Sequence, residues 1–150
     1  MRAVIQRVTS CSLRIDNQAY SSIDKGLLIL LGIEDADEQS DVEWLCKKIA
    51  HLRIFNDSSE IMNLDINEVR GEAMVVSQFT LHASTRKGNR PSYIKASKPA
   101  TAIPLYESFI LLLRSEIHQE IATGVFGADM QIELVNDGPV TIIIDTKLKE

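Results

Sequence analysis

The stretch GLLILLGI, from Gly26 to Ile33, is the longest apolar run in the 150-residue chain. It is too short to cross a bilayer, and an unbroken apolar run of this length is typical of a strand that is buried on both faces. Turn residues precede the run at Asp24, and an acidic loop, Glu34–Glu38, follows it. We therefore expect the fold to be organised around a central buried strand at Leu27–Ile33.

The chain before this strand is predicted to form further strands. Cys11, Leu13 and Ile15 alternate with polar residues, which is the period of a half-buried strand. A turn that begins at Asp16 then leads into a second strand, Ala19–Ile23.

The chain after the acidic loop changes to a helical period. Apolar residues recur on one face between Ser40 and His51, and Ser40, with Glu43 three residues on, is the expected N-cap. A strand at Leu52–Phe55 is expected next, and another at Glu72–Phe79 after a turn.

The C-terminal half contains a second helix and two more strands. The apolar spacing predicts a helix from Thr101 to Gln119, with Thr101 as a cap and Pro104 in the first turn. Two strands, Met130–Val135 and Val140–Asp145, are expected to be joined by the turn at 136–139. Because the chain has no repeats or linkers, residues 1–150 are predicted to form a single mixed α/β domain of about eight strands and two main helices, with sheets layered with helices.

The charge of the chain is unevenly distributed. The formal net charge is −5, which argues against a general nucleic-acid coat protein. Between Ala73 and Tyr106, however, there is no acidic residue, and this stretch holds Arg86, Lys87, Arg90, Lys95 and Lys98. A basic segment on an acidic body can hold a phosphate backbone at one place, although a solvated basic loop accounts for the composition equally well.

Several classes of site are not indicated by the sequence. The N-terminus has no apolar segment of the kind found in signal peptides, so we expect a cytoplasmic protein without a membrane segment. Cys11 and Cys46 lie far apart and are interpreted as small buried hydrophobes. The three histidines show no metal-ligand spacing, and no nucleotide-binding or metalloprotease motif is present, so neither a metal nor a cofactor is expected.

Two short segments carry groups that could do chemistry. The first, SQFTL at Ser77–Leu81, places hydroxyls, an amide and turning backbone at a strand end, where they could stabilise an oxyanion. The second, NDGPVT at Asn136–Thr141, contains a Gly-Pro bond that can be cis at a cost of only about 0.5–1 kcal/mol. Its glycine also permits close approach to the backbone. By spacing alone, a self-capped strand end and a plain turn are the simpler interpretations.

Taken together, the two segments resemble the signature motifs of the D-aminoacyl-tRNA deacylase family. The resemblance extends over nearly the whole chain and includes MRAVIQRV at the start, GLLILLGI, LRIF at Leu52–Phe55, TRKGNRPS at Thr85–Ser92 and TGVFGADM at Thr123–Met130. It implies a deacylase-type fold, a homodimer with active sites at the subunit interface, and aminoacyl-tRNA as the partner. The implied reaction is hydrolysis of the ester of D-aminoacyl-tRNA, and of glycyl-tRNA, with release of the amino acid and tRNA.

The resemblance also assigns roles to residues. Ser77, Gln78, Phe79 and Thr80 would line the catalytic pocket. Gly138 and Pro139 would reach the partner's active site through a cis peptide bond and exclude L-amino acids, and Arg7 would steady them. Contacts to the terminal adenine and the tRNA are expected from Phe126, Met130, Arg86, Lys87 and Arg90.

The expected chemistry needs little from the protein. An aminoacyl ester is already activated, and one oxyanion donor contributes about 2.7–4 kcal/mol to transition-state stabilisation. The ribose 2′-hydroxyl beside the ester could transfer the proton, and the family resemblance favours this route over Thr80 as a nucleophile, because no base stands beside Thr80 in the sequence.

Three other functions remain open at this point. The chain could be a nucleic-acid-binding module that uses the basic loop without catalysis. It could be a structural homodimer in which the Gly-Pro turn only packs an interface. It could also be an editing deacylase directed at L-alanine or glycine, although the two motifs argue against that specificity.

Overall fold

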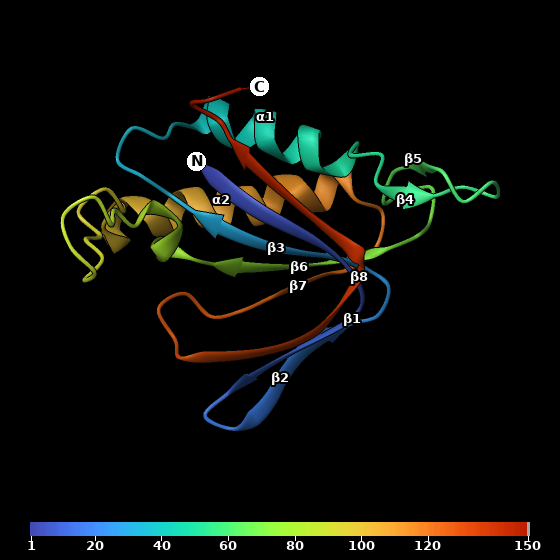
Figure 1. The fold of residues 1–150 in the computed structure, drawn as a ribbon, viewed down its shortest axis with the longest axis horizontal. Helices are drawn as coiled ribbons and strands as arrows, with labels where there is room; N and C mark the ends of the chain where they lie inside the picture. Colours follow the sequence, from blue (N-terminus) through green and yellow to red (C-terminus); the bar gives the residue numbers. More distant parts are fainter. Residues whose placement is uncertain (150) are drawn as a thin grey trace.

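The computed structural model describes residues 1–149 (Figure 1). Its main sheet has six strands in the order β2-β1-β3-β6-β7, and β8 pairs with the other edge of β1. The long strand β1 (Arg2–Ile15) pairs with β3 (Gly26–Gly32) through its first half and with β2 (Gln18–Ile23) through its second half. Strand β8 (Met130–Asp145) follows β1 along nearly its whole length. The β1–β2 hairpin therefore folds away below β3, as Figure 1 shows.

The strands in the middle of the sheet are parallel. Strand β6 (Glu72–Ser77) lies parallel to β3 on one side and to β7 (Ile121–Thr123) on the other. A separate two-stranded sheet is formed by β4 (Phe55–Asn56) and β5 (Met62–Leu64).

Two helices cover one face of the sheet. Helix α1 (Gln39–Ala50) and helix α2 (Pro99–Glu116) pack on the same side of β3 and β6 (Figure 1), and the main core lies between them and the sheet. A second core lies on the opposite face, and its buried residues are Val8, Cys11, Leu13, Ile23, Leu28, Met74 and Val76.

The strand that was expected to organise the fold is buried on both faces. Leu27, Ile29 and Leu31 belong to the main core, and Leu28 belongs to the second core. The predicted fold class, mixed α/β with eight strands and two main helices, is confirmed.

The predicted boundaries of α1 need correction. The helix begins at Gln39, and its N-cap is Glu38 rather than Ser40. The reason is that the Asp41 carboxylate accepts a hydrogen bond from the Glu38 backbone N–H at 2.9 Å, which fixes the N-cap two residues, and the first helical residue one residue, earlier than expected. After α1, the predicted strand at Leu52–Phe55 is wrong except at Phe55, because residues 52–54 are held in local turns by backbone hydrogen bonds.

The predicted boundaries of α2 are also shifted. Lys98, not Thr101, is the N-cap, and Pro99 occupies a first-turn position that suits its fixed φ. The helix ends at Glu116 because Ile117 is already extended. Pro104 consequently lies beyond the first turn, where its missing N–H does remove a helical hydrogen bond, contrary to the expectation.

The two C-terminal strands are one bent strand. Residues 136–139 do not reverse the chain, since both halves of β8 pair with β1, with register shifts on either side of Val8. The prediction of a turn between two strands is therefore wrong, and the segment is a bulged bend. The strand predicted at Glu72–Phe79 ends at Ser77, and the short 3-10 helix η1 (Phe79–His82) follows.

Candidate active site at the end of strand β6

The first motif lies at the carboxyl end of the parallel strands. Residues Ala73–Val76 of β6 are fully buried between two neighbouring strands, so the chain can present polar groups only where the strand ends. Ser77 closes β6, Gln78 leaves the strand, and η1 then turns the backbone. Ligand sites in α/β sheets are typically found at such carboxyl ends.

A small cavity of about 70 Å³ lies at this strand end. It is lined mainly by apolar groups, to which Ser77, Gln78 and Ser97 add polar ones. Phe126 forms part of the wall, and its ring packs edge-on against Tyr106 with 5.8 Å between ring centroids. The structure therefore brings together four residues that the sequence predicted for the site: Ser77, Gln78, Phe79 and Phe126.

Hydrogen bonding within the first motif leaves donors available. The side-chain amide of Gln78 donates to Oγ1 of Thr80. The backbone N–H groups of Phe79 and Thr80 begin η1 and have no acceptor among residues 1–149. No imidazole or carboxylate in the described part of the chain hydrogen-bonds to Thr80. The strand end thus offers oxyanion donors but no base that would activate the Thr80 hydroxyl.

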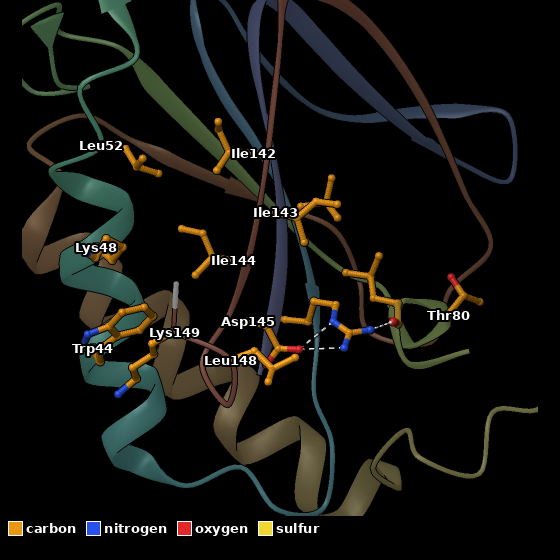
Figure 2. Close-up of a pocket in the computed structure, with 13 residues that line it drawn as sticks. Trp44, Lys48, Leu52, Thr80, Ile142, Ile143, Ile144, Asp145, Leu148 and Lys149 are labelled. Carbon is orange, nitrogen blue, oxygen red and sulfur yellow. Dashed lines mark hydrogen bonds and ion pairs between the residues drawn. The ribbon is translucent and has the colours of Figure 1, made fainter. Parts of the chain in front are cut away.

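A much larger groove, of about 790 Å³, lies between α1 and β8 (Figure 2). Its walls are Trp44 and Lys48 of α1, the segment Ile142–Asp145 of β8, and Thr80. Lys149 lies over the Trp44 ring, with Nζ 4.6 Å from the ring centroid. Thr80 and Leu81 of the first motif line this groove, whereas Ser77, Gln78 and Phe79 line the smaller cavity, so we place the chemistry in the smaller cavity.

The second motif is braced against β1. The Gly138-Pro139 bond is cis, and both residues are exposed. Arg7, only 6% exposed, places its Nε 3.0 Å from the Asp137 carboxylate and donates through Nη1 to the Ile54 carbonyl at 2.6 Å. On the other side of the bend, the Asn136 side-chain amide donates to the carbonyls of Arg7 at 3.1 Å and Val140 at 3.0 Å. The Gly-Pro pair is therefore held between two fixed points.

The two motifs lie at opposite ends of the sheet. Asn136 is paired through Val8 with Gly26, whereas Ser77 is paired with Leu31. Five positions along β3 correspond to about 16 Å. Neither Gly138 nor Pro139 lines the small cavity or the groove. Within one chain, the two motifs therefore do not form a common site.

The other predicted contact residues have different surroundings. Met130 is half-buried and packs against the second core, and the basic residues Arg86, Lys87 and Arg90 are exposed on the loop after η1. The contacts expected of them with adenine or tRNA stay predictions. Burial raises the pKa of the Cys11 thiol to about 11, and burial, together with the nearby charge of Glu116, raises that of Cys46 to about 12. The interpretation of both cysteines as buried hydrophobes is confirmed.

The sequence did not indicate three features of the site. Ser97 and Ala102 line the small cavity, although they lie 16 and 21 residues beyond Leu81, the last residue of the first motif. The Asn136 side chain holds the second motif in place through its hydrogen bonds to the carbonyls of Arg7 and Val140. The one signal of these features in the sequence was the small side chain of Ala102 in the first turns of α2, because a small side chain leaves room beside the end of β6. Among residues 1–149, no cluster of three metal-ligating side chains is present, and neither helix is both long and apolar enough to span a membrane.

Comparison with known proteins shows which proteins this chain resembles over its whole length. The chain is 61% identical to the D-aminoacyl-tRNA deacylase of Bacteroides thetaiotaomicron and 60% identical to that of Flavobacterium psychrophilum, in each case over the full length of both proteins. A solved structure described as c-Myc DNA Unwinding Element Binding Protein is 39% identical, with a TM-score of 0.92 over 97% of this chain and 98% of the other. A structure described as a probable eukaryotic D-amino acid tRNA deacylase is 15% identical, with a TM-score of 0.82 over 95% and 97% of the two chains, and shares the fold.

The model of the hydrolase family described as D-Tyr-tRNA(Tyr) deacylase matches residues 4–145, which include most of β1, both helices and both motifs. With this match and with relatives of about 60% identity over its whole length, the chain belongs to the D-Tyr-tRNA(Tyr) deacylase family.

Proposed function

We propose that the protein hydrolyses the ester bond of D-aminoacyl-tRNA, and of glycyl-tRNA, and releases the free amino acid and tRNA. The observation that carries this proposal is the cavity at the end of β6, where Ser77, Gln78, Phe79 and Phe126 meet. The relatives named above as deacylases, at about 60% identity, support the same reaction. The cytoplasm, where charged tRNA is used, is the expected location.

In the proposed reaction, the ester carbonyl lies beside the start of η1. The unpaired N–H groups of Phe79 and Thr80 are the donors that would stabilise the negative charge developing on the carbonyl oxygen. The Gln78 amide, bound to Thr80 Oγ1, would hold this turn in place. Since Thr80 has no neighbouring base, the substrate's own 2′-hydroxyl is the better candidate for moving the proton from the attacking water.

The aromatic groups at the cavity would hold the end of the RNA. Phe126 is supported edge-on by Tyr106, whose hydroxyl donates to the Val75 carbonyl at 3.0 Å. A ring supported in this way presents a fixed surface for stacking with the terminal adenine. Met130, at the start of β8, is the second residue proposed to contact that base.

We further propose that a second copy of the chain completes the site. The second motif lies about 16 Å along the strands from the first, and Gly138 and Pro139 are exposed. In a homodimer, their backbone would face the substrate's α-carbon in the partner's cavity. A braced backbone excludes an L side chain more reliably than an adaptable side chain would, and it leaves room for a D side chain or the hydrogen of glycine.

The first experiment is to incubate catalytic amounts of protein with D-Tyr-tRNA and L-Tyr-tRNA and to follow loss of the acyl group. We expect rapid release from the D-ester while the L-ester is spared. Equal cleavage of both esters would retain the hydrolase and remove the proposed role of Gly138 and Pro139 in selection.

One observation favours a second candidate function. The solved structure at 39% identity is that of a protein described as binding a DNA unwinding element, and this chain carries a basic loop at residues 83–98. A binding module would retain nucleic acid in a salt-sensitive way without releasing the amino acid at substoichiometric protein. Turnover therefore decides between the two functions.

A further inference from the structure

A polar cavity of about 530 Å³ lies beyond the other end of η1 from the catalytic motif. His82, the last residue of η1, lines it, together with Arg86 and Lys95 of the basic loop. Arg2 and Lys147, from the ends of the paired strands β1 and β8, complete the basic lining. The acidic residues that line it are Glu34 and Asp145.

Two of the four cations are already engaged. Arg2 forms a salt bridge with Asp145 at 2.7 Å and donates to the Leu81 carbonyl at 2.6 Å. Lys147 Nζ lies 2.7 Å from the Asp41 carboxylate. Arg86 and Lys95 form no ion pair within residues 1–149, and Glu34 is the one lining carboxylate that is also without a cation there. The cavity therefore has an excess of positive charge that its own walls do not neutralise.

His82 provides an independent observation. It is one of the residues that line the cavity and is only 3% exposed, and its buried Nε2 has no hydrogen-bond partner among the described residues. Leaving a buried polar atom unpaired is costly, so proteins usually pair such atoms with a protein group, water or a ligand. A histidine beside unpaired Arg and Lys side chains is a donor set that suits a phosphate oxygen.

We infer that this cavity binds a phosphodiester group of the RNA substrate, near the esterified end. The inference rests on the proposed function, because η1 connects the catalytic motif to the polar cavity. Gln78–Thr80 stand at its start and His82 at its end, and four residues of 3-10 helix span about 8 Å. A strand whose terminal ribose lies at the small cavity can therefore place one of its next phosphates between Arg86 and Lys95.

The test compares two double variants of equal charge change. Arg86→Gln with Lys95→Gln removes both unpaired cations of the cavity. Lys47→Gln with Arg114→Gln, on the exposed faces of α1 and α2, is the matched control. Two substrates are used with each protein: D-Tyr-tRNA, and the D-tyrosyl ester of adenosine, which has no phosphate.

We expect the cavity variant to raise the KM for D-Tyr-tRNA roughly tenfold and to lower the salt dependence of KM, with kcat unchanged. Hydrolysis of the adenosine ester should not change, and the control should behave as the wild type with both substrates. Equal effects of the two double variants, or equal loss on both substrates, would overturn the inference.

Binding is measured separately, so that the outcome does not depend on hydrolysis. A short RNA ending in CCA is titrated by fluorescence anisotropy, with inorganic phosphate as a competitor. The cavity variant should bind the RNA roughly tenfold more weakly even if the wild type proves to hydrolyse neither substrate, a result that would remove the proposed function alone. Inorganic phosphate binding more tightly than the RNA would assign the cavity to a small phosphate and overturn the polynucleotide assignment.

His82→Leu, which keeps a similar side-chain size, separates a binding role from a structural one. The substitution removes the unpaired Nε2, so we expect weaker RNA binding with little loss of thermal stability. Unchanged RNA binding in this variant would exclude His82 from the site.

Discussion

The two motifs of this chain are built in opposite ways. Residues 77–80 lie where a fully buried parallel strand ends, and Ser77, Gln78 and Phe79 line a cavity of their own chain. Residues 136–139 lie at the other end of the sheet, with Gly138 and Pro139 exposed, and line neither the cavity nor the groove. The first motif places its groups against a cavity of the same chain, whereas the second motif exposes the backbone of Gly138 and Pro139 on the surface. The difference indicates a site that one chain does not complete by itself.

The most sensitive test of this contrast is complementation between two inactive variants. Gln78→Ala removes the amide that holds Thr80. Gly138→Ala adds a Cβ at a residue with φ of +119°, and that Cβ would lie 2.9 Å from Val140 Cγ2 and 3.0 Å from Arg7 Nη2. Each variant alone is expected to lose roughly 100-fold in the rate of D-Tyr-tRNA hydrolysis.

Mixing the two variants after reversible dissociation should restore about a quarter of the wild-type sites, because half of the dimers are then mixed and each has one intact site. The activity of the mixture is followed as the subunits exchange. Activity that remains at the level of the separate variants would mean that each chain uses both of its own motifs.

Removing the Arg7 contacts that hold the second motif is expected to have the next largest effect. Arg7→Met leaves the Ile54 carbonyl and the Asp137 carboxylate without their partner, so we expect the free energy of unfolding to fall by roughly 3 kcal/mol. Arg7→Lys should recover only part of this loss, since an ammonium group does not reproduce the guanidinium fork. Urea unfolding measures the stability, and amide hydrogen exchange in residues 134–142 reports the local effect. Full recovery by lysine would show that charge alone is sufficient.

The ion pair of Asp41 with Lys147, which includes no residue of either motif, supplies the reference for that value. Burial opposes ionisation of Asp41, but hydrogen bonds from Lys147 and from the Glu38 backbone outweigh it and lower the pKa of Asp41 to about 2. A lowered folded-state pKa contributes stability that is present above the unfolded pKa, near 3.8, and is lost as the pH falls toward 2. Asp41→Asn should therefore cost roughly 2 kcal/mol at pH 7, and the difference should shrink as the pH falls below about 4 and close near pH 2. Urea unfolding at several pH values tests this, and a difference that does not depend on pH would refute it.

The smallest expected effect belongs to the outer basic residues. Lys87 and Arg90 are exposed on the same loop as Arg86 but line neither the small cavity nor the polar cavity. Lys87→Gln with Arg90→Gln should raise the KM for D-Tyr-tRNA about two- to threefold through weaker long-range attraction, and added salt should remove the difference. A rise as large as that for Arg86 and Lys95 would mean that the whole loop, and not the cavity, holds the RNA.

Much of the fold was predictable because it rests on local pattern. The apolar run at 26–33 predicted a strand buried on both faces. The helical spacing at 40–51 predicted α1, with an error of one residue at each end. The ends of the helices were predicted less well, because the position of the N-cap depends on which side chain accepts a hydrogen bond from a backbone N–H at the start of the helix. The Asp41 carboxylate accepts a hydrogen bond from the Glu38 N–H, so the N-cap is not at Ser40, the more usual type of capping residue.

The bend in β8 shows where local pattern misleads. Asn-Asp-Gly-Pro is a turn sequence, and a reversal of the chain was the reasonable prediction. Both flanking segments nevertheless pair with the same long strand, β1, and only the register of that pairing distinguishes a bulge from a hairpin.

By itself, the sequence determined the fold class, the central strand and the two motifs as separate groups of residues, because strand and helix periods and turn residues act over a few neighbouring positions. The tertiary structure alone decided that Ser97, Ala102 and Phe126 join the first motif, that Arg7 and Asn136 brace the second, and that the motifs stand at opposite ends of one sheet. These relations depend on strand register and on the packing of segments 20 to 130 residues apart. Contacts over such separations arise only when the whole core forms at once, since no short segment contains both partners.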